Sequence, residues 1–250
     1  MAKLDGLLKL RGSVGGLTFV RGEHGETYVK EKSGPRPCRL KDGEDFANSR
    51  RAAAEFKTSG KATRTFRYAM DRLLAGVEGR SLTGRINAWL LRAIQSDAVN
   101  EWGYRRVEAG DLTVLEGFEF NESLPLEELL PLNLRDRVPA GRDEARISVP
   151  GFRLRRADKN VPKLATHFRM VSAMIFVDFD KHTYSRAVRV GPMTAIGRKS
   201  GADFDFDHGI VPKPGELSFW LLGVEFVRQE GDKPVVVRGG AVRCMRVWGA

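Results

Sequence analysis

The stretch of sequence that decides the fold is FWLLGVEF, at Phe219–Phe226 of the 250-residue chain. If this stretch is extended, both of its faces are apolar except at Glu225. A strand that is apolar on both faces is typical of the middle of a sheet that protein covers on both sides. The sequence therefore predicts that Glu216–Arg228 is a central, doubly covered strand.

Alternation with a period of two continues on both sides of this strand, from residue 113 to the end of the chain. Turns rich in Pro, Gly and Asp separate the segments at a spacing typical of a β-sandwich. We expect further strands at Thr113–Phe120, Ala145–Val149, Phe168–Phe179, Thr183–Val190, Ala202–Asp207, Val235–Arg238 and Ala241–Val247. The connection over residues 121–141 is expected to hold one short helix. Residues 109–250 are thus predicted to form an antiparallel, immunoglobulin-like β-sandwich.

Residues 44–108 are predicted to be helical. Strong helix formers fill Phe46–Phe56, and Gly60 is expected to end or kink this helix. A second apolar stripe stops at Gly79 and consists of Phe66, Met70, Leu73 and Val77. A third follows Ser81, a candidate N-cap, and consists of Ile86, Trp89, Leu90, Ala93 and Ile94.

Residues 1–43 are predicted to be a hairpin arm with a linker. Two β-rich runs, Leu17–Val20 and Glu26–Lys30, flank a turn bounded by glycines. The two prolines of Gly34–Arg39 favour a linker over a central strand or a helix interior. An isolated two-stranded hairpin is marginally stable in water, so we expect it to lie on its own chain, a second copy or another partner. The predicted fold class is therefore α+β: a hairpin arm, a short helical segment and the sandwich.

The composition is that of a folded, basic protein. Hydrophobic residues make up 42% of the chain, and the formal net charge is +10. Residues 1–100 carry 19 Lys and Arg against 11 Asp and Glu, so most of the excess charge lies there. Such a charge permits contact with nucleic acid or another acidic surface but does not require it.

The sequence gives no sign of secretion, membrane insertion or a disulfide framework. The first residues include Asp5, Lys9 and Arg11 and lack the apolar core of a signal peptide. Apolar runs are too short or too interrupted to span a bilayer. We expect free thiols at Cys38 and Cys244, and cytoplasmic synthesis of a protein that could leave the cell as part of a particle.

Several motifs invite a catalytic or ligand-binding reading, but simpler structures explain them better. The alternating aspartates of Asp203–Asp207 resemble the start of a calcium loop, yet His208 stands at the glycine position and Pro214 at the glutamate position. A strand with Phe204 and Phe206 inward explains the same pattern. The glycines of Gly191–Ser200 are too far apart for a phosphate loop and predict a basic turn.

No other residues are arranged for chemistry. The four histidines never pair with one another or with a cysteine at metal-ligand spacing, and neither cysteine stands in a nucleophile motif. Asp178 and Asp180 alternate with Phe179, as solvated carboxylates on a strand do. We therefore expect no catalytic residues, no cofactor and no metal, that is, a protein that is not an enzyme.

A basic helical face is the candidate nucleic-acid contact. If Gly60 does not break the helix, one side of it carries Arg50, Lys57, Lys61 and Arg64. Such a stripe can neutralise several phosphates. A solvated face with internal ion pairs explains the same pattern, and aromatic residues do not interleave with the charges as they do in a base-stacking platform.

Four segments of the first 62 residues resemble a known family: Lys9–Phe19, Gly25–Lys32, Phe46–Arg50 and Glu55–Ala62. The family is one of uncharacterised bacterial proteins that open with a glycine-rich hairpin of the type KLKGTIGGLTF and continue into a helix of the type FARTREN…EFG…GKAGK. The chain departs from the family at Arg51–Ala53, where the family often carries ENG. The resemblance implies a C-terminal immunoglobulin-like β-sandwich and supplies no catalytic residues.

From these patterns we expect the protein to be a non-enzymatic structural subunit. The subunit would assemble into a filament, tube, ring or virion-like particle by adding the strands of its arm to a sheet edge of a neighbouring copy. The expected assembly residues are Gly12, Gly15, Gly16, Leu17, Phe19, Tyr28 and Val29. A nucleic-acid-associated protein that uses the basic N-terminal region is the alternative. The expected partners are copies of the chain and, in the alternative, nucleic acid, but no membrane.

Overall fold

The computed structural model of the chain describes residues 2–4, 12–32, 34–35, 37–77, 79, 81–130, 135–137, 144–197, 201–231 and 233–249. The chain divides into two compact units, Met1–Arg50 and Arg51–Ala250, which we call the N-terminal unit and the C-terminal unit. Lys9–Arg11 of the family motif and residues 198–200 of the predicted basic turn lie outside the described residues.

The N-terminal unit contains the predicted hairpin within a larger sheet. Strands β3 and β4 pair antiparallel, and the Gly22 amide closes their turn by donating to the Glu26 carbonyl (2.8 Å). Two short strands flank the hairpin and give the order β1-β4-β3-β2. The hairpin is confirmed, but it is the centre of a four-stranded sheet. The strands are β1 (Ala2–Leu4), β2 (Gly12–Val14), β3 (Leu17–Arg21) and β4 (Thr27–Glu31).

The predicted linker is shorter than expected, because helix α1 (Pro37–Asp42) begins inside it. Proline is tolerated in the first turn of a helix, where its missing N–H would have no intrahelical acceptor. A 3-10 turn, η1 (Glu44–Phe46), connects α1 to the long helix α2 (Ala47–Ala69). The predicted linker Gly34–Arg39 therefore ends in helix, since Pro37, Cys38 and Arg39 are the first residues of α1.

Helix α2 is continuous through Gly60, which neither ends nor visibly interrupts it. Glycine costs about 1 kcal/mol relative to alanine inside a helix. Packing offsets that cost, since Ser59 and Thr63 both donate hydrogen bonds to Asn87 Oδ1 (2.9 and 3.2 Å) and Phe66 is fully buried. Tertiary contacts on both sides of Gly60 thus override its local preference.

The other predicted apolar stripes pack into the C-terminal unit and are buried, except for Val77, which lies beyond α3 (Asp71–Leu74) and is half-buried. The stripe that starts at Phe66 crosses a helix break at Met70 into α3. The stripe of Ile86, Trp89, Leu90, Ala93 and Ile94 is the buried face of α4 (Leu82–Ser96), as predicted. Ser81 holds the predicted N-cap position, but its backbone is left-handed (φ 60°) and its side chain makes no capping hydrogen bond.

Two antiparallel sheets make up the rest of the C-terminal unit. The larger has the order β12-β11-β7-β8, with β9 also paired to β7, and the smaller has the order β10-β6-β5. Their strands are β5 (Arg135–Arg137), β6 (Glu144–Phe152), β7 (His167–Asp178), β8 (Thr183–Val190), β9 (Thr194–Ala195), β10 (Ala202–Gly209), β11 (Leu217–Glu230) and β12 (Lys233–Trp248). The α+β class, with helices and antiparallel sheets, is confirmed.

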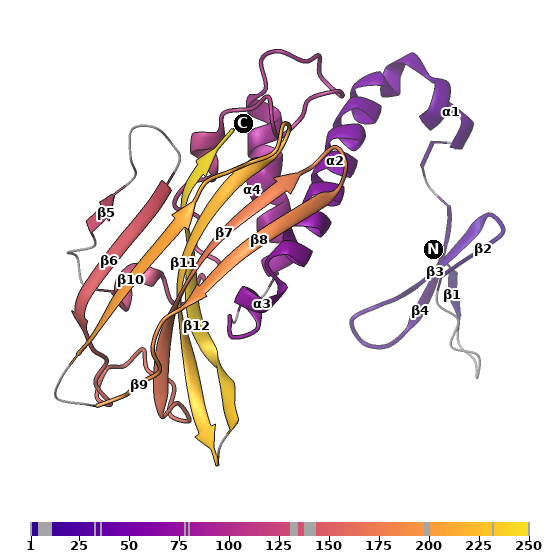
Figure 1. Cartoon of the computed structure of the whole chain (residues 1–250). Helices are drawn as coiled ribbons and strands as arrows, with labels where there is room; N and C mark the ends of the chain where they lie inside the picture. Colours follow the sequence, from indigo (N-terminus) through magenta and orange to yellow (C-terminus); the bar gives the residue numbers. More distant parts are fainter. Residues whose placement is uncertain are drawn as a thin grey trace. The chain divides into compact units, whose positions relative to one another are not determined.

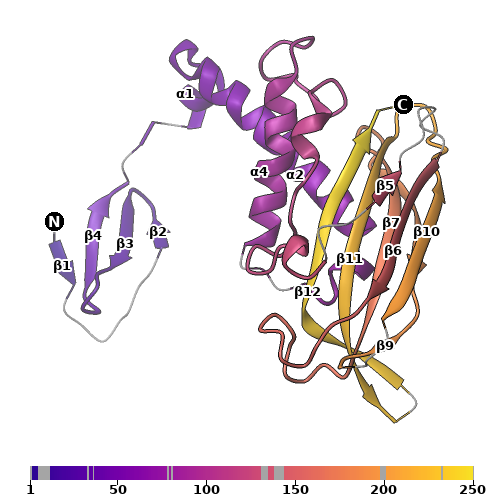
Figure 2. The same ribbon diagram turned by 90° about the vertical axis from the view of Figure 1, so that its left-hand side faces the viewer.

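The larger sheet is the middle of three layers in this unit. Helices α2 and α4 cover one face, and the smaller sheet covers the other (Figures 1 and 2). Phe219 and Leu221 of β11 pack on the helix side, whereas Trp220 and Leu222 pack on the side of the smaller sheet. The prediction of a central strand covered on both sides is confirmed.

One predicted strand, Thr113–Phe120, was wrong in its first half. Residues Leu112–Leu115 form a 3-10 turn, η2, because the Asp111 carboxylate accepts the Thr113 amide (2.9 Å) and the Trp89 indole donates to the Leu115 carbonyl (3.1 Å). The second half does pair with β12: the Phe120 amide donates to the Val242 carbonyl (2.8 Å).

Two further expectations were partly met. Val235–Arg238 and Ala241–Val247 belong to one strand, β12, with Gly239 in a positive-φ conformation (109°) between them. The 121–141 connection contains a 3-10 turn, η3 (Leu126–Glu128), and strand β5. None of the helices in the described part has the length and hydropathy needed to span a membrane.

Candidate functional sites

The first candidate site is one face of the N-terminal sheet. Strand register places Val14, Leu17, Phe19 and Val29 on the same face, since Val14 pairs with Leu17 and Phe19 with Val29. Of these side chains, Val14 is 68% and Leu17 43% exposed. Three of the predicted assembly residues, Leu17, Phe19 and Val29, therefore share a face with Val14; we call these four residues the apolar face.

The remaining predicted assembly residues lie elsewhere in the same sheet. Tyr28 is on the opposite face with Val20, to which it is paired. Gly15 and Gly16 form the turn between β2 and β3, where Gly15 has a φ of 58° that glycine adopts without strain. Gly12 opens β2. The glycines thus shape the sheet itself.

The N-terminal unit builds no hydrophobic core from its described residues. Thr27 is the one buried residue among them, and every buried apolar side chain described in the chain lies at or beyond Ala62. Sheets become independently stable when an apolar face is packed against other structure. Among the described residues, the apolar face is therefore partly exposed.

The second candidate site is the exposed face of α2 within the C-terminal unit. The unbroken helix places Lys57, Lys61 and Arg64 at intervals of four and three residues, on one side. All three are exposed, and none belongs to an ion pair among the described residues. Tyr68 follows Arg64 by four residues and is 60% exposed. Tyr68 does not interleave with these charges but follows them at the end of α2, on the same side of the helix.

Arg50, the fourth predicted contact, has a local structural task in the N-terminal unit. Its guanidinium donates to the Leu40 carbonyl (3.2 Å) and the Gly43 carbonyl (2.8 Å). Both carbonyls lie at the end of α1, where arginine side chains commonly satisfy free carbonyl groups. Arg50 therefore fastens the turn between α1 and α2.

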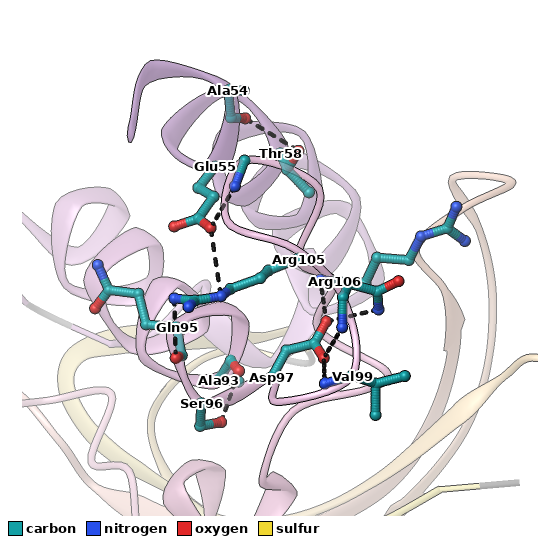
Figure 3. A network of polar contacts seen from close by, with 12 residues as sticks. Ala54, Glu55, Thr58, Ala93, Gln95, Ser96, Asp97, Val99, Arg105 and Arg106 are labelled. Atoms are coloured by element: carbon teal, nitrogen blue, oxygen red, sulfur yellow. Dashed lines mark hydrogen bonds and ion pairs between the residues drawn. The ribbon is translucent and has the colours of Figure 1, made fainter. Parts of the chain in front are cut away.

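A polar network that the sequence analysis missed anchors the loop after α4 (Figure 3). Asp97 accepts the amides of Val99 (2.8 Å), Asn100 (3.0 Å) and Arg106 (3.0 Å). Burial acts to raise the pKa of Asp97, but these hydrogen bonds outweigh it and lower that pKa to about 2. The sequence signal was an aspartate directly after a helix with an asparagine three residues on, which is typical of an Asx turn.

Buried Glu55 of α2 ties the same loop to the helices. Its Oε1 accepts the Gly103 amide (3.0 Å) and lies 3.8 Å from Arg105 Nε. In Figure 3 the Glu55 and Arg105 side chains point toward one another from α2 and from the loop. The two acids bind backbone and guanidinium groups, so this network positions the loop.

The predicted calcium-like segment is a strand with its aspartates outward. Phe204 and Phe206 are buried and Asp203, Asp205 and Asp207 are exposed. The strand interpretation is therefore confirmed. Among the described residues, no three or more His, Cys, Asp or Glu side chains are grouped so that they could hold a metal ion.

His208, which continues this strand, is buried between the two sheets. Its Nε2 lies 2.9 Å from Ser172 Oγ, and that oxygen accepts a hydrogen bond from Trp220 Nε1 (3.0 Å). His208 Nδ1 has no hydrogen-bond partner in the described part of the chain. Burial, together with the charge of Arg189, lowers the pKa of His208 to about 4, while Asp207 opposes the shift. The imidazole of the folded protein is therefore neutral well above pH 4.

Both cysteines are free: Cys38 is exposed on α1 and Cys244 is buried in β12. Burial raises the pKa of the Cys244 thiol, so it is a packed core residue. Comparison of the chain with protein-family models, with curated proteins and with solved structures found no match.

Proposed function

We propose that the protein is a structural subunit that assembles with copies of itself through its N-terminal unit. The observation that carries the proposal is the apolar face of Val14, Leu17, Phe19 and Val29 on a sheet whose described residues bury no apolar side chain. Association that covers these side chains removes apolar surface from water, which is the main favourable term in protein assembly.

The receiving surface that we propose is the edge strand β8 of a neighbouring copy. The opposite edge of the same sheet, β12, is covered, since residues 117–120 and Gly76 hydrogen-bond to it. Strand β8 makes no backbone hydrogen bond on its outer side to another described residue, and it exposes Tyr184 and Val190. An open edge of this kind accepts a strand from another chain.

The order of the N-terminal sheet decides which strand can be added. Strands β3 and β4 are interior, whereas β1 and β2 are at the edges. We therefore propose that β2 extends the neighbour's β8, while the apolar face packs against that neighbour. Donor and acceptor are different surfaces, so each copy can both give and receive, and the assembly is a ring or an open filament or tube, according to whether the rotation closes.

The immunoglobulin-like character of the two sheets stays a prediction. Its support is that two antiparallel sheets of the C-terminal unit enclose a shared apolar core. A virion-like particle is one of the closed assemblies that such a module could build.

The test compares two substitutions on opposite faces of the N-terminal sheet. Leu17 and Val20 are similarly exposed, at 43% and 40%, and belong to the same strand. In the full chain, Leu17→Asp places a charge on the apolar face and is expected to abolish assembly, measured by light scattering and negative-stain microscopy. Val20→Asp introduces the same charge on the other face and is expected to leave assembly intact.

The assembly proposal fails if the unmodified protein is monomeric at high concentration, or if both substitutions have the same effect. Removing residues 1–33, which takes away the whole sheet, should also give a monomer. If the truncated protein still assembles, the interface lies in the C-terminal unit and the proposal is wrong.

A further inference from the structure

The exposed face of α2 points to a second role besides assembly, the binding of single-stranded nucleic acid. Between Arg51 and Ala69, helix α2 carries five basic side chains and a single acidic one, Glu55. Glu55 is buried against Gly103 and Arg105, on the side away from solvent. The exposed side of the helix within the C-terminal unit is therefore positive without a compensating carboxylate of its own.

A groove lies beside these charges, between α2, α3 and the first turn of α4. Its volume is about 610 Å³, and its walls include Arg64, Arg67, Tyr68 and Thr83. Gly60 also lines it, and a Cβ at that position would meet nothing within 4 Å, so the wall is open there. The groove is large enough to admit one nucleobase or sugar beside the helix.

The groove keeps its positive character despite one carboxylate in its lining. Asp71 is paired with Arg186, which also donates to the Ala69 carbonyl (3.0 Å). Arg67 is held in place by a hydrogen bond from its Nη1 to Thr83 Oγ1 (2.6 Å). Arg64 has no carboxylate within ion-pair distance among the described residues. An anionic ligand in the groove thus meets two guanidinium groups. That of Arg67 is held in place, and that of Arg64 has no carboxylate partner among the described residues.

We propose that this face binds single-stranded nucleic acid. Lys57, Lys61 and Arg64 contact consecutive phosphates, and a base stacks on Tyr68 at the mouth of the groove. An exposed aromatic ring among unpaired cations suits an unstacked base, since a duplex keeps the faces of its bases covered. All of these groups belong to the C-terminal unit, so none of them lies on the apolar face of the N-terminal sheet.

The test measures binding of a fluorescently labelled single strand of about 12 nucleotides, within the span of known single-strand sites. The full chain is titrated at about 50 mM salt and followed by anisotropy. Lys61→Glu is expected to weaken binding at least tenfold, and Tyr68→Ala about 5- to 150-fold, the range for loss of one stacked base. Circular dichroism of each variant confirms that it remains folded.

Two matched controls carry the same chemical changes elsewhere. Lys159→Glu reverses an exposed lysine in a loop, and Tyr104→Ala removes a tyrosine that is 77% exposed. Both are expected to bind like the unmodified protein, apart from a small general effect of charge. If Lys159→Glu weakens binding as much as Lys61→Glu, the interaction reflects net charge alone and the proposed site is wrong.

Salt dependence and a duplex competitor complete the test. Three phosphate contacts predict that the logarithm of the binding constant falls with the logarithm of salt with a slope of about −2, and Lys61→Ala should reduce that slope by about 0.7. A duplex of the same sequence should bind at least tenfold more weakly. Equal binding of the duplex, an unchanged slope in Lys61→Ala, or no binding at about 50 mM salt would each overturn the proposal.

Discussion

The two units of this chain use β-structure in opposite ways. In the C-terminal unit a sheet is buried on both faces, and Phe219 at its centre has no exposed surface. In the N-terminal unit a four-stranded sheet leaves Val14 and Leu17 exposed and buries no described apolar side chain. Backbone hydrogen bonds build a sheet in both units, but among the described residues only the first kind of sheet buries apolar side chains. The second kind is suited to completion by another surface.

The largest expected difference between the units is the response to removing one phenylalanine ring. Phe219→Ala leaves a cavity among Phe66, Trp89 and Phe179, and should lower the free energy of unfolding by about 3–5 kcal/mol. Phe19→Ala removes a half-exposed ring and should change that value by less than about 1 kcal/mol. Urea denaturation of dilute protein measures both. Equal losses would show that the N-terminal sheet belongs to the same cooperative core.

Acid should weaken the C-terminal unit through His208. The folded protein binds a proton at this residue only near pH 4, whereas the unfolded chain does so near pH 6.5. Between these values the unfolded state binds more protons, so stability present above pH 6.5 is lost as the pH falls towards 4. The loss is at most about 3 kcal/mol, at 1.36 kcal/mol for each pKa unit.

The measurement is the denaturation midpoint between pH 7 and pH 4 for the unmodified protein and for His208→Gln. The variant should be less stable at pH 7 but should show a shallower decline with acid. An equally steep decline in His208→Gln would assign the acid sensitivity to other groups.

Sequence alone located the C-terminal strands well, because their period of two and their turn residues are local signals. Strand β8 has the predicted bounds, and β11 was predicted to be doubly covered. The first half of Thr113–Phe120 alternates like a strand, yet its structure depends on the Trp89 indole, which lies 26 residues earlier. Such a long-range contact leaves no trace in a local pattern.

The candidate sites were predictable to the extent that they follow from strand register and helix period. Leu17, Phe19 and Val29 share a face because of hairpin pairing, which the sequence indicates directly. Tyr68 lies on the same side as Lys57 only because α2 continues through Gly60, where Ser59 and Thr63 pack against Asn87. Glu55 was missed because its partners lie in a loop about 50 residues away.

A smaller effect is expected from the polar anchor of the loop after α4. Asp97→Ala leaves the amides of Val99, Asn100 and Arg106 without their acceptor, and should cost about 2 kcal/mol. Since the pKa of Asp97 is lowered to about 2 from 3.8, its contribution is present above pH 3.8 and is lost as the pH falls towards 2. Asp205→Ala, an exposed control, should be neutral in the same denaturation measurement.

The smallest expected effect lies in the N-terminal unit and tests whether that unit is stabilised independently. Arg50→Ala removes two hydrogen bonds to carbonyls near the surface, which water can replace, so the local cost is about 0.5–1 kcal/mol. Hydrogen exchange at the Gly43 and Phe46 amides should accelerate a few-fold, because both lie in the turn that Arg50 fastens. Amides of β11 should exchange as before, since their opening requires the C-terminal core to unfold. If they also accelerate, the two units share one opening reaction, and the contrast between a self-sufficient sheet and a partner-dependent one would have to be abandoned.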